Sequence, residues 1–252
     1  MYAKLMKIVS DSQADIGIAG YVEDDGTKTE RKSGKAVSGV YKADRLCKLK
    51  REMLYAGTYY EQAVIPSVCN KVFKREILAR NVSNIHPDIR MGEDSACTYP
   101  CLLDADCVVI DNDICAYHYM CRTGSMSRSF DERYFYRTAL LFKLLDEKFS
   151  HSDIDGVCEQ LRYYKLFMIQ YGISGILRCK DKSLFKKNAE VEEVVKNFDT
   201  EKLIASLDFE GFAADERRKV MMLSNSKERR KLMRNELKAE LKYKIKKLLG
   251  RE

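Results

Sequence analysis

The chain has 252 residues, of which 45% are hydrophobic and 33% are charged, a composition typical of a folded soluble protein rather than a disordered one. No apolar run is long enough to span a bilayer, and the N-terminus turns polar too early for a signal peptide, so we expect a cytoplasmic protein. The net charge of +7 comes from residues 227–252, which hold eleven Lys/Arg and four Asp/Glu, so the rest of the chain is neutral and a nucleic-acid partner is not expected.

The first ninety residues alternate between helical and extended patterns. Apolar spacing predicts a helix over 1–11, and "ADIGIAGYV" at 14–22 predicts a mostly buried strand whose small residues permit close backbone approach. The polar segment 23–35 predicts a turn or hairpin loop. Helices are then expected over 42–56, ending at Gly57, and near 74–80.

The next segment predicts a helix that starts near Glu93, with Pro100 causing a kink or a short first segment. Two short strands follow over 107–111 and 114–119, with a turn at Asn112–Asp113. Helical patterns fill the rest of the chain. They are expected near 131–149, 152–178, 190–207, 212–224 and 227–249.

The fold class expected from this order is α/β, a layered sheet followed by an all-α C-terminal region. We divide the chain into residues 1–129, a helical region 130–225 and a basic amphipathic helix 226–252. The expected sheet is small, with about one long strand before residue 100 and three or four short strands in all, so a part that completes it is expected to be missing.

Cysteine and histidine give no sign of a metal centre. The nine cysteines include no CxxC pair, and the three histidines are scattered, so reduced and mostly buried thiols are expected. Cys97 and Cys101 lie on one face of the predicted helix, but two soft ligands do not make a zinc site.

Several short motifs resemble, in the same order, the second half of the bacterial glycosyltransferase family 2 domain, which has the inverting GT-A type of fold (Rossmann-like). The resemblance covers roughly residues 1–130, and the opening "MYAKLMKIVSDSQADIGIAGY" is similar to the segment after the metal-binding acid motif of that family. The motifs are Asn70-Lys71, Gly92-Glu93-Asp94, Tyr117-x-Tyr119 and Arg122-x-x-Ser125-x-Ser127.

The resemblance implies a sugar transfer from a nucleotide-sugar to a cell-surface polysaccharide or lipid-linked acceptor, as in capsule or exopolysaccharide synthesis. It makes Asp94 the general base and Glu93 a neighbour that orients the acceptor or the helix start. It also implies phosphate binding by Arg122 with Ser125, and more weakly by Lys71 beside Asn70.

Simpler readings stand beside these. Acids in a first helical turn complement the helix dipole, so "GED" alone indicates a plain helix start. Tyr117 and Tyr119 suit packing on a strand. Asp104 and Asp106 resemble a metal-binding Asp-x-Asp but are expected to end a helix, and "VEDDG" at 22–26 is read as a turn.

The departure from the family is the donor side. The family places a nucleotide-binding half and an Asp-x-Asp motif for a divalent cation, Mg or Mn, before this segment, and the ligands of that cation are not in this chain. We expect a truncated product with little activity of its own. The alternatives are a partner chain that completes the site or a relic, and an open sheet edge would favour self-association.

The cationic segment gives a second hypothesis. Met233, Leu237, Leu241, Ile245 and Leu248 share one helical face among basic residues. Such a helix packs on its own domain or contacts an anionic membrane at its inner face. The chain would then be a non-catalytic interaction or membrane-anchoring subunit that pairs with a complete transferase.

Overall fold

The computed structural model describes residues 1–121, 131–179 and 181–248. The chain divides into two units, Met1–Lys165 and Leu166–Glu252. The first unit mixes helices and strands, and the described part of the second unit consists of helices and their connections. The predicted α/β class is therefore confirmed.

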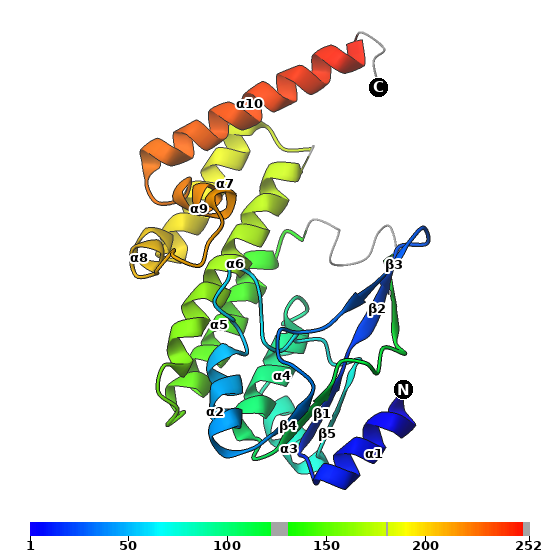
Figure 1. The fold of residues 1–252 in the computed structure, drawn as a ribbon. Helices are drawn as coiled ribbons and strands as arrows, with labels where there is room; N and C mark the ends of the chain where they lie inside the picture. The colour runs from blue at the N-terminus through cyan, green and yellow to red at the C-terminus, as the bar shows by residue number, and fades with distance from the viewer. Residues whose placement is uncertain (122–130, 180, 249–252) are drawn as a thin grey trace. The chain divides into compact units, whose positions relative to one another are not determined.

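A four-stranded sheet organises the first unit, and helices cover both of its faces (Figure 1). The order is β4-β6-β1-β5, in which β1 and β6 are parallel while β4 and β5 run antiparallel at the two edges. Because β1 and β6 are parallel, the carboxyl ends of both strands lie at the same end of the sheet. The strands are Ile16–Ala19 (β1), Gly39–Tyr41 (β4), Lys71–Phe73 (β5) and Val108–Asp111 (β6).

A second sheet of three strands follows from the first, in the order β3-β2-β7. Its strands are Tyr21–Asp24 (β2), Thr29–Lys32 (β3) and His118–Met120 (β7). The single strand predicted over 14–22 is thus wrong, because it divides at Gly20 between the two sheets. The predicted turn is confirmed: Asp25 Oδ1 accepts hydrogen bonds from the amides of Thr27 and Lys28 at 2.9 and 3.0 Å.

Helix α1 (Tyr2–Ser12) packs closely on one face of the four-stranded sheet. A Cβ on Gly17 would come within 2.4 Å of Val9 Cγ2, so the approach of the helix requires glycine at this point of β1. Leu5 and Ala14 are buried in the same interface. The close backbone approach predicted from the small residues of β1 is confirmed.

Helix α4 (Glu93–Asp104) lies on the other side of the sheet from α1 (Figure 1). It contacts α3 (Arg75–Val82) and α5 (Tyr134–Ser150). The helix runs continuously through Pro100, so the predicted short first segment is wrong. Burial of most of its side chains offsets the one backbone hydrogen bond that proline removes.

The C-terminal end of α4 is held by Lys50 of α2 (Ala43–Glu52). The Lys50 ammonium donates to the carbonyls of Leu103 and Ala105 at 2.9 and 2.8 Å. A cation at this end of a helix satisfies the last carbonyls and complements the helix dipole.

The second unit contains the end of α6 (Val157–Arg178) and four further described helices. These are Leu184–Asn197 (α7), Thr200–Ala205 (α8), Ala214–Met221 (α9) and Ser226–Leu248 (α10). The single helix predicted over 190–207 is wrong, because Asp199 adopts φ 47° and separates α7 from α8. Buried Arg229 joins these helices through Glu192 at 2.8 Å and Glu201 at 2.6 Å.

Fewer strands were predicted from the sequence than the structure contains. Five described strands precede residue 100, where about one long strand was expected. The strands that were missed, β3, β4 and β5, have only three or four residues, and β3 consists of the polar residues "TERK". Such short segments carry too little hydrophobic alternation to be recognised. None of the helices in the described part of the chain combines the length and apolarity that a membrane crossing needs.

Candidate functional site

The site predicted around "GED" begins at the N-terminus of α4. Gly92 has φ 90°, a left-handed conformation that glycine adopts without a steric penalty, and Glu93 is the first helical residue. The predicted helix start is therefore confirmed. Glu93 and Asp94 both lie in the first turn, where the helix dipole favours negative charge.

Asp94 is half-buried, and its environment favours the protonated form. Desolvation raises the pKa of the carboxyl, and this outweighs the Lys71 ammonium and a backbone hydrogen bond from Val68, which act in the opposite direction. A carboxylate with a raised pKa is a stronger base than an ordinary aspartate. Asp94 therefore has the electrostatic property that a proton acceptor needs.

Glu93 reaches the surface beside Asp94, but the surrounding protein also raises its pKa. Desolvation is the main cause, and the negative charge of Asp94 adds to it, whereas the amides of Gly92 and Glu93 itself favour the carboxylate. The two adjacent acids thus share an environment in which ionisation of one opposes ionisation of the other.

Asn70 and Lys71 lie behind the site and are buried. The Lys71 ammonium donates to the carbonyls of Ile65 and Ser67, both at 2.6 Å, and to Asn70 Oδ1 at 3.0 Å. Three bonds use all three protons of an ammonium group. Desolvation lowers the pKa of Lys71 to about 7, although the charge of Asp94 acts against this.

Asn70 ties the same loop to the sheet. Its amide side chain donates to the carbonyl of Ala19, at the end of β1, while its Oδ1 accepts from the Ser67 hydroxyl at 3.0 Å. The Asn70-Lys71 pair therefore positions the loop 65–70 beside Asp94. Direct binding of a substrate by either residue stays a prediction, and the predicted Arg122 and Ser125 lie outside the described residues.

Three side chains of α4 fix the orientation of its first turns, and sequence reasoning missed them. Thr98 donates to the carbonyl of Pro66 at 2.5 Å, Tyr99 donates to the carbonyl of Val64 at 3.2 Å, and Ser95 accepts from the Tyr164 hydroxyl at 2.7 Å. Their spacing of three and four residues, with polar groups inside an apolar helix, is the signal that could have revealed them.

The thiol of Cys69 lies near Asp94, and the phenol of Tyr117 contacts that thiol. Cys69 is half-buried, and desolvation together with the charge of Asp94 raises its pKa. The Tyr117 hydroxyl donates to the Cys69 sulfur. Tyr117 is half-buried as predicted for a packing residue, whereas Tyr119 is 41% exposed.

Within the Asp104-x-Asp106 pair, Asp104 has a structural role. Asp104 is the last residue of α4, as predicted, and binds Lys148 at 2.7 Å and Asn81 at 2.8 Å. Within the described residues, no group of three or more His, Cys, Asp or Glu side chains could hold a metal ion.

Only three of the nine cysteines are fully buried, so the prediction of mostly buried thiols is wrong.

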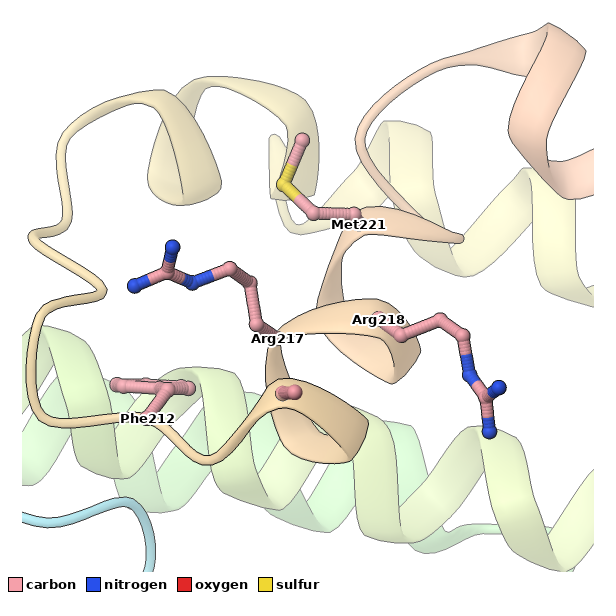
Figure 2. A pocket seen from close by; sticks show the side chains of 5 residues that line it. Phe212, Arg217, Arg218 and Met221 are labelled. Atoms are coloured by element: carbon pink, nitrogen blue, oxygen red, sulfur yellow. The ribbon is translucent and has the colours of Figure 1, made fainter.

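A surface hollow occurs in the second unit, on α9 and the segment before it (Figure 2). Arg217 and Arg218 extend in different directions from α9, and Phe212 lies on the Arg217 side. Both guanidinium groups have protein partners: Arg217 donates to the carbonyl of Phe209 at 2.5 Å, and Arg218 binds Asp215. Each of the two arginines at the hollow thus has a hydrogen-bond or ion-pair partner within the protein, and we assign the hollow no role.

Comparison with known proteins finds neither a family model nor a curated protein that matches this chain.

Proposed function

We propose that the chain carries the acceptor side of an inverting glycosyltransferase site of the GT-A type, with Asp94 as the general base. The observation that carries the proposal is the raised pKa of Asp94, beside Lys71 and the loop whose Asn70 binds Ala19 at the carboxyl end of β1. In α/β sheets, ligands bind outside the carboxyl ends of the strands. The ordered motifs around "GED" supply the reaction class.

The proposed chemistry is a single displacement. A hydroxyl oxygen of the acceptor attacks the anomeric carbon of a nucleotide-sugar, the bond to the diphosphate breaks on the opposite face, and Asp94 takes the hydroxyl proton. Inversion follows because attack and departure occur on opposite faces. Desolvation of Asp94 strengthens it for this step, and the anchored turns of α4 keep its position fixed.

Other residues have supporting roles in the proposal. Glu93 orients the acceptor or the helix start, Asn70 and Lys71 hold the loop beside Asp94, and Arg122 with Ser125 binds the departing diphosphate. A divalent cation, Mg or Mn, would offset charge on that diphosphate when bound. The described residues offer no cluster that fits such a cation, so no step is assigned to it.

The test is a transfer assay on the full-length product of the gene. It would be incubated with a panel of UDP-, GDP- and CDP-sugars and with glycan acceptors, and acceptor-dependent release of nucleoside diphosphate would be measured. Loss of a general base lowers turnover by about 10²–10⁴-fold, so Asp94→Asn should lose at least about a hundredfold while donor binding stays nearly unchanged.

Glu76→Gln is the matched control, because Glu76 is an acid in the first turn of α3 that the proposal leaves without a catalytic role. Its turnover should equal that of the wild type. Undiminished turnover of Asp94→Asn would refute the assignment of Asp94 as the base. Absence of transfer with every donor would refute the proposed transferase activity.

We also propose that α10 contacts an anionic membrane on the cytoplasmic face, as a peripheral or anchoring contact. Its charge supports this: eleven basic residues stand against four acidic ones over 227–252. Leu237 and Leu241 are 43% and 50% exposed on the same helix. Basic helices with exposed apolar residues bind anionic lipid surfaces.

This contact would be tested by flotation with two kinds of phosphatidylcholine vesicle, one with 30% phosphatidylglycerol and one without it. The chain should float only with the anionic vesicles, less so at high salt, and Leu237→Ser with Leu241→Ser should weaken it. Equal behaviour with both vesicle types would contradict the proposal and favour packing of α10 on its own unit.

A further inference from the structure

The loop over residues 65–70 is folded around the side chain of Lys71. The Lys71 ammonium donates to the carbonyls of Ile65 and Ser67, both at 2.6 Å, and the Lys71 amide donates to the Val68 carbonyl at 3.1 Å. Lys71 is only 4% exposed, so these bonds form away from water, where they are stronger. Three carbonyls of the loop are thus directed by one residue.

The same loop is bound along helix α4, and its contacts follow the helix repeat. The Thr98 hydroxyl donates to the Pro66 carbonyl at 2.5 Å, and one turn earlier Asp94 accepts a hydrogen bond from the Val68 amide. Residues four apart lie on one face of a helix, with a rise of about 6 Å between them. Two residues of extended chain cover about 6–7 Å. The contact at Thr98 therefore brings Val68 level with Asp94.

One peptide group joins Lys71 to Asp94. The Ser67 carbonyl, which accepts from Lys71, and the Val68 amide, which donates to Asp94, belong to the same planar unit. Because a trans peptide group is planar, a bond that fixes its oxygen also fixes the direction of its N–H. A cation on the oxygen also polarises the group and strengthens the N–H as a donor.

We propose that Lys71 is a positioning residue, which aims the Asp94 carboxylate by fixing the peptide group between Ser67 and Val68. The inference rests on the proposed transferase. It gives Lys71 a role other than binding the diphosphate, since Ile65, Ser67 and Asn70 accept all three protons of its ammonium. The Val68 amide occupies one lone-pair position of the carboxylate and leaves others for the acceptor hydroxyl.

The charges around Lys71 give the sign of the expected pH effects. Asp94, Cys69 and Cys97 are the titratable groups whose charges act on it. Lys71 and the Val68 amide both favour the Asp94 carboxylate, so their loss should raise the pKa of Asp94 further. Burial lowers the pKa of Lys71 to about 7, and the charge of Asp94 acts against this. By reciprocity, loss of Asp94 should lower the pKa of Lys71 further.

The test follows the carboxyl carbon of Asp94 and the amide proton of Val68 by NMR as the pH is varied, in the 252-residue chain. In the wild type the two signals should titrate with one midpoint, because protonation of the acid removes the charge that the amide faces. In Lys71→Met the midpoint of Asp94 should move at least about one pH unit higher, and the Val68 signal should no longer follow it.

Lys74→Met is the matched control, because Lys74 is an exposed lysine that pairs with Asp15 rather than with the loop. It should leave both signals unchanged. A second measurement does not depend on the folding of Lys71→Met. In Asp94→Asn, the Nζ of Lys71 should titrate at least about one pH unit lower than in the wild type.

The full-length protein gives a kinetic readout. Turnover needs the Asp94 carboxylate and is lost as the pH falls through its pKa, so the acid limb of the turnover profile should move to higher pH in Lys71→Met. Separate midpoints for Asp94 and Val68 in the wild type, or an unmoved midpoint or acid limb in a variant, would overturn the inference. The expected NMR results in a chain that transfers no sugar would keep the coupling and remove only the transferase.

Discussion

The acids near the two ends of strand β1 have pKa values shifted in opposite directions. At its amino end, Asp15 is buried, binds Lys74 at 2.6 Å and accepts from the amides of Asp106 and Cys107 at 2.7 and 2.9 Å. Desolvation opposes ionisation of Asp15, but these partners outweigh it and lower its pKa. At the carboxyl end, desolvation prevails and raises the pKa of Asp94.

Helix α4 repeats this contrast along its own length. At its C-terminal end, desolvation of Asp104 is outweighed by Lys148 and Asn81, which lower its pKa, and Lys50 binds the last carbonyls. At its N-terminal end, the pKa values of Glu93 and Asp94 are both raised. Acids that stabilise the fold receive donors and cations, whereas those at the proposed site are left poorly compensated, as chemistry at a carboxylate requires.

The largest effect expected from this comparison is at the Asp15 end. Asp15→Ala leaves the buried amide of Cys107 and the part-buried amide of Asp106 without their acceptor, and should lower the free energy of unfolding by about 2–3 kcal/mol, measured by urea denaturation. Lys74→Ala, which removes only the exposed cation, should cost much less.

The pH dependence of this loss follows from its sign. Because folding lowers the pKa of Asp15, its contribution is present above the ordinary aspartate range and disappears as the pH falls through the folded pKa. The difference between wild type and Asp15→Ala should therefore shrink in acid. An equal difference at neutral and strongly acidic pH would contradict the account of this end.

A smaller effect of opposite sign is expected at Tyr60, which has φ 63°. Tyr60→Asn relieves the left-handed strain and should raise the free energy of unfolding by about 1 kcal/mol in the same urea experiment. A loss of stability would show that Tyr60 serves the fold.

The smallest effect belongs to Asp94 itself. Because folding raises its pKa, the ionised carboxylate disfavours the folded state, and stability attributable to this group falls as the pH rises through that pKa. Asp94→Asn should therefore be slightly more stable than the wild type at neutral pH, by less than about 1 kcal/mol for a partly solvated group. The two proteins should converge in acid, and a clear destabilisation at neutral pH would contradict this reading.

The sequence predicted the elements that have long or capped patterns. Helix α1, the start of α4 at Glu93 and the turn at Asp25 all follow from local residues, and the structure confirms them. It did not predict the division of 14–22 at Gly20 or the break at Asp199, because both depend on where the chain must turn to pack. Local periodicity does not contain that information.

Only part of the candidate site could be predicted from the sequence, for a similar reason. The acids of "GED" are visible in the sequence, but their burial and their partners, such as Lys71 and the Val68 amide beside Asp94, depend on segments distant in the chain. The left-handed backbone of Tyr60 could not be predicted either, because a positive φ at a tyrosine has no sequence signature. The buried networks of Asn70 and Lys71 likewise appear only when β1 and the loop meet.

The most direct test of the central claim is a paired measurement on the full-length protein. Turnover per folded molecule and the free energy of unfolding would be measured for Asp94→Asn and Asp15→Ala. We expect Asp94→Asn to lose at least about a hundredfold in turnover with its stability kept, and Asp15→Ala to lose stability with its turnover kept. Full turnover by Asp94→Asn would contradict the claim that this carboxylate is the base.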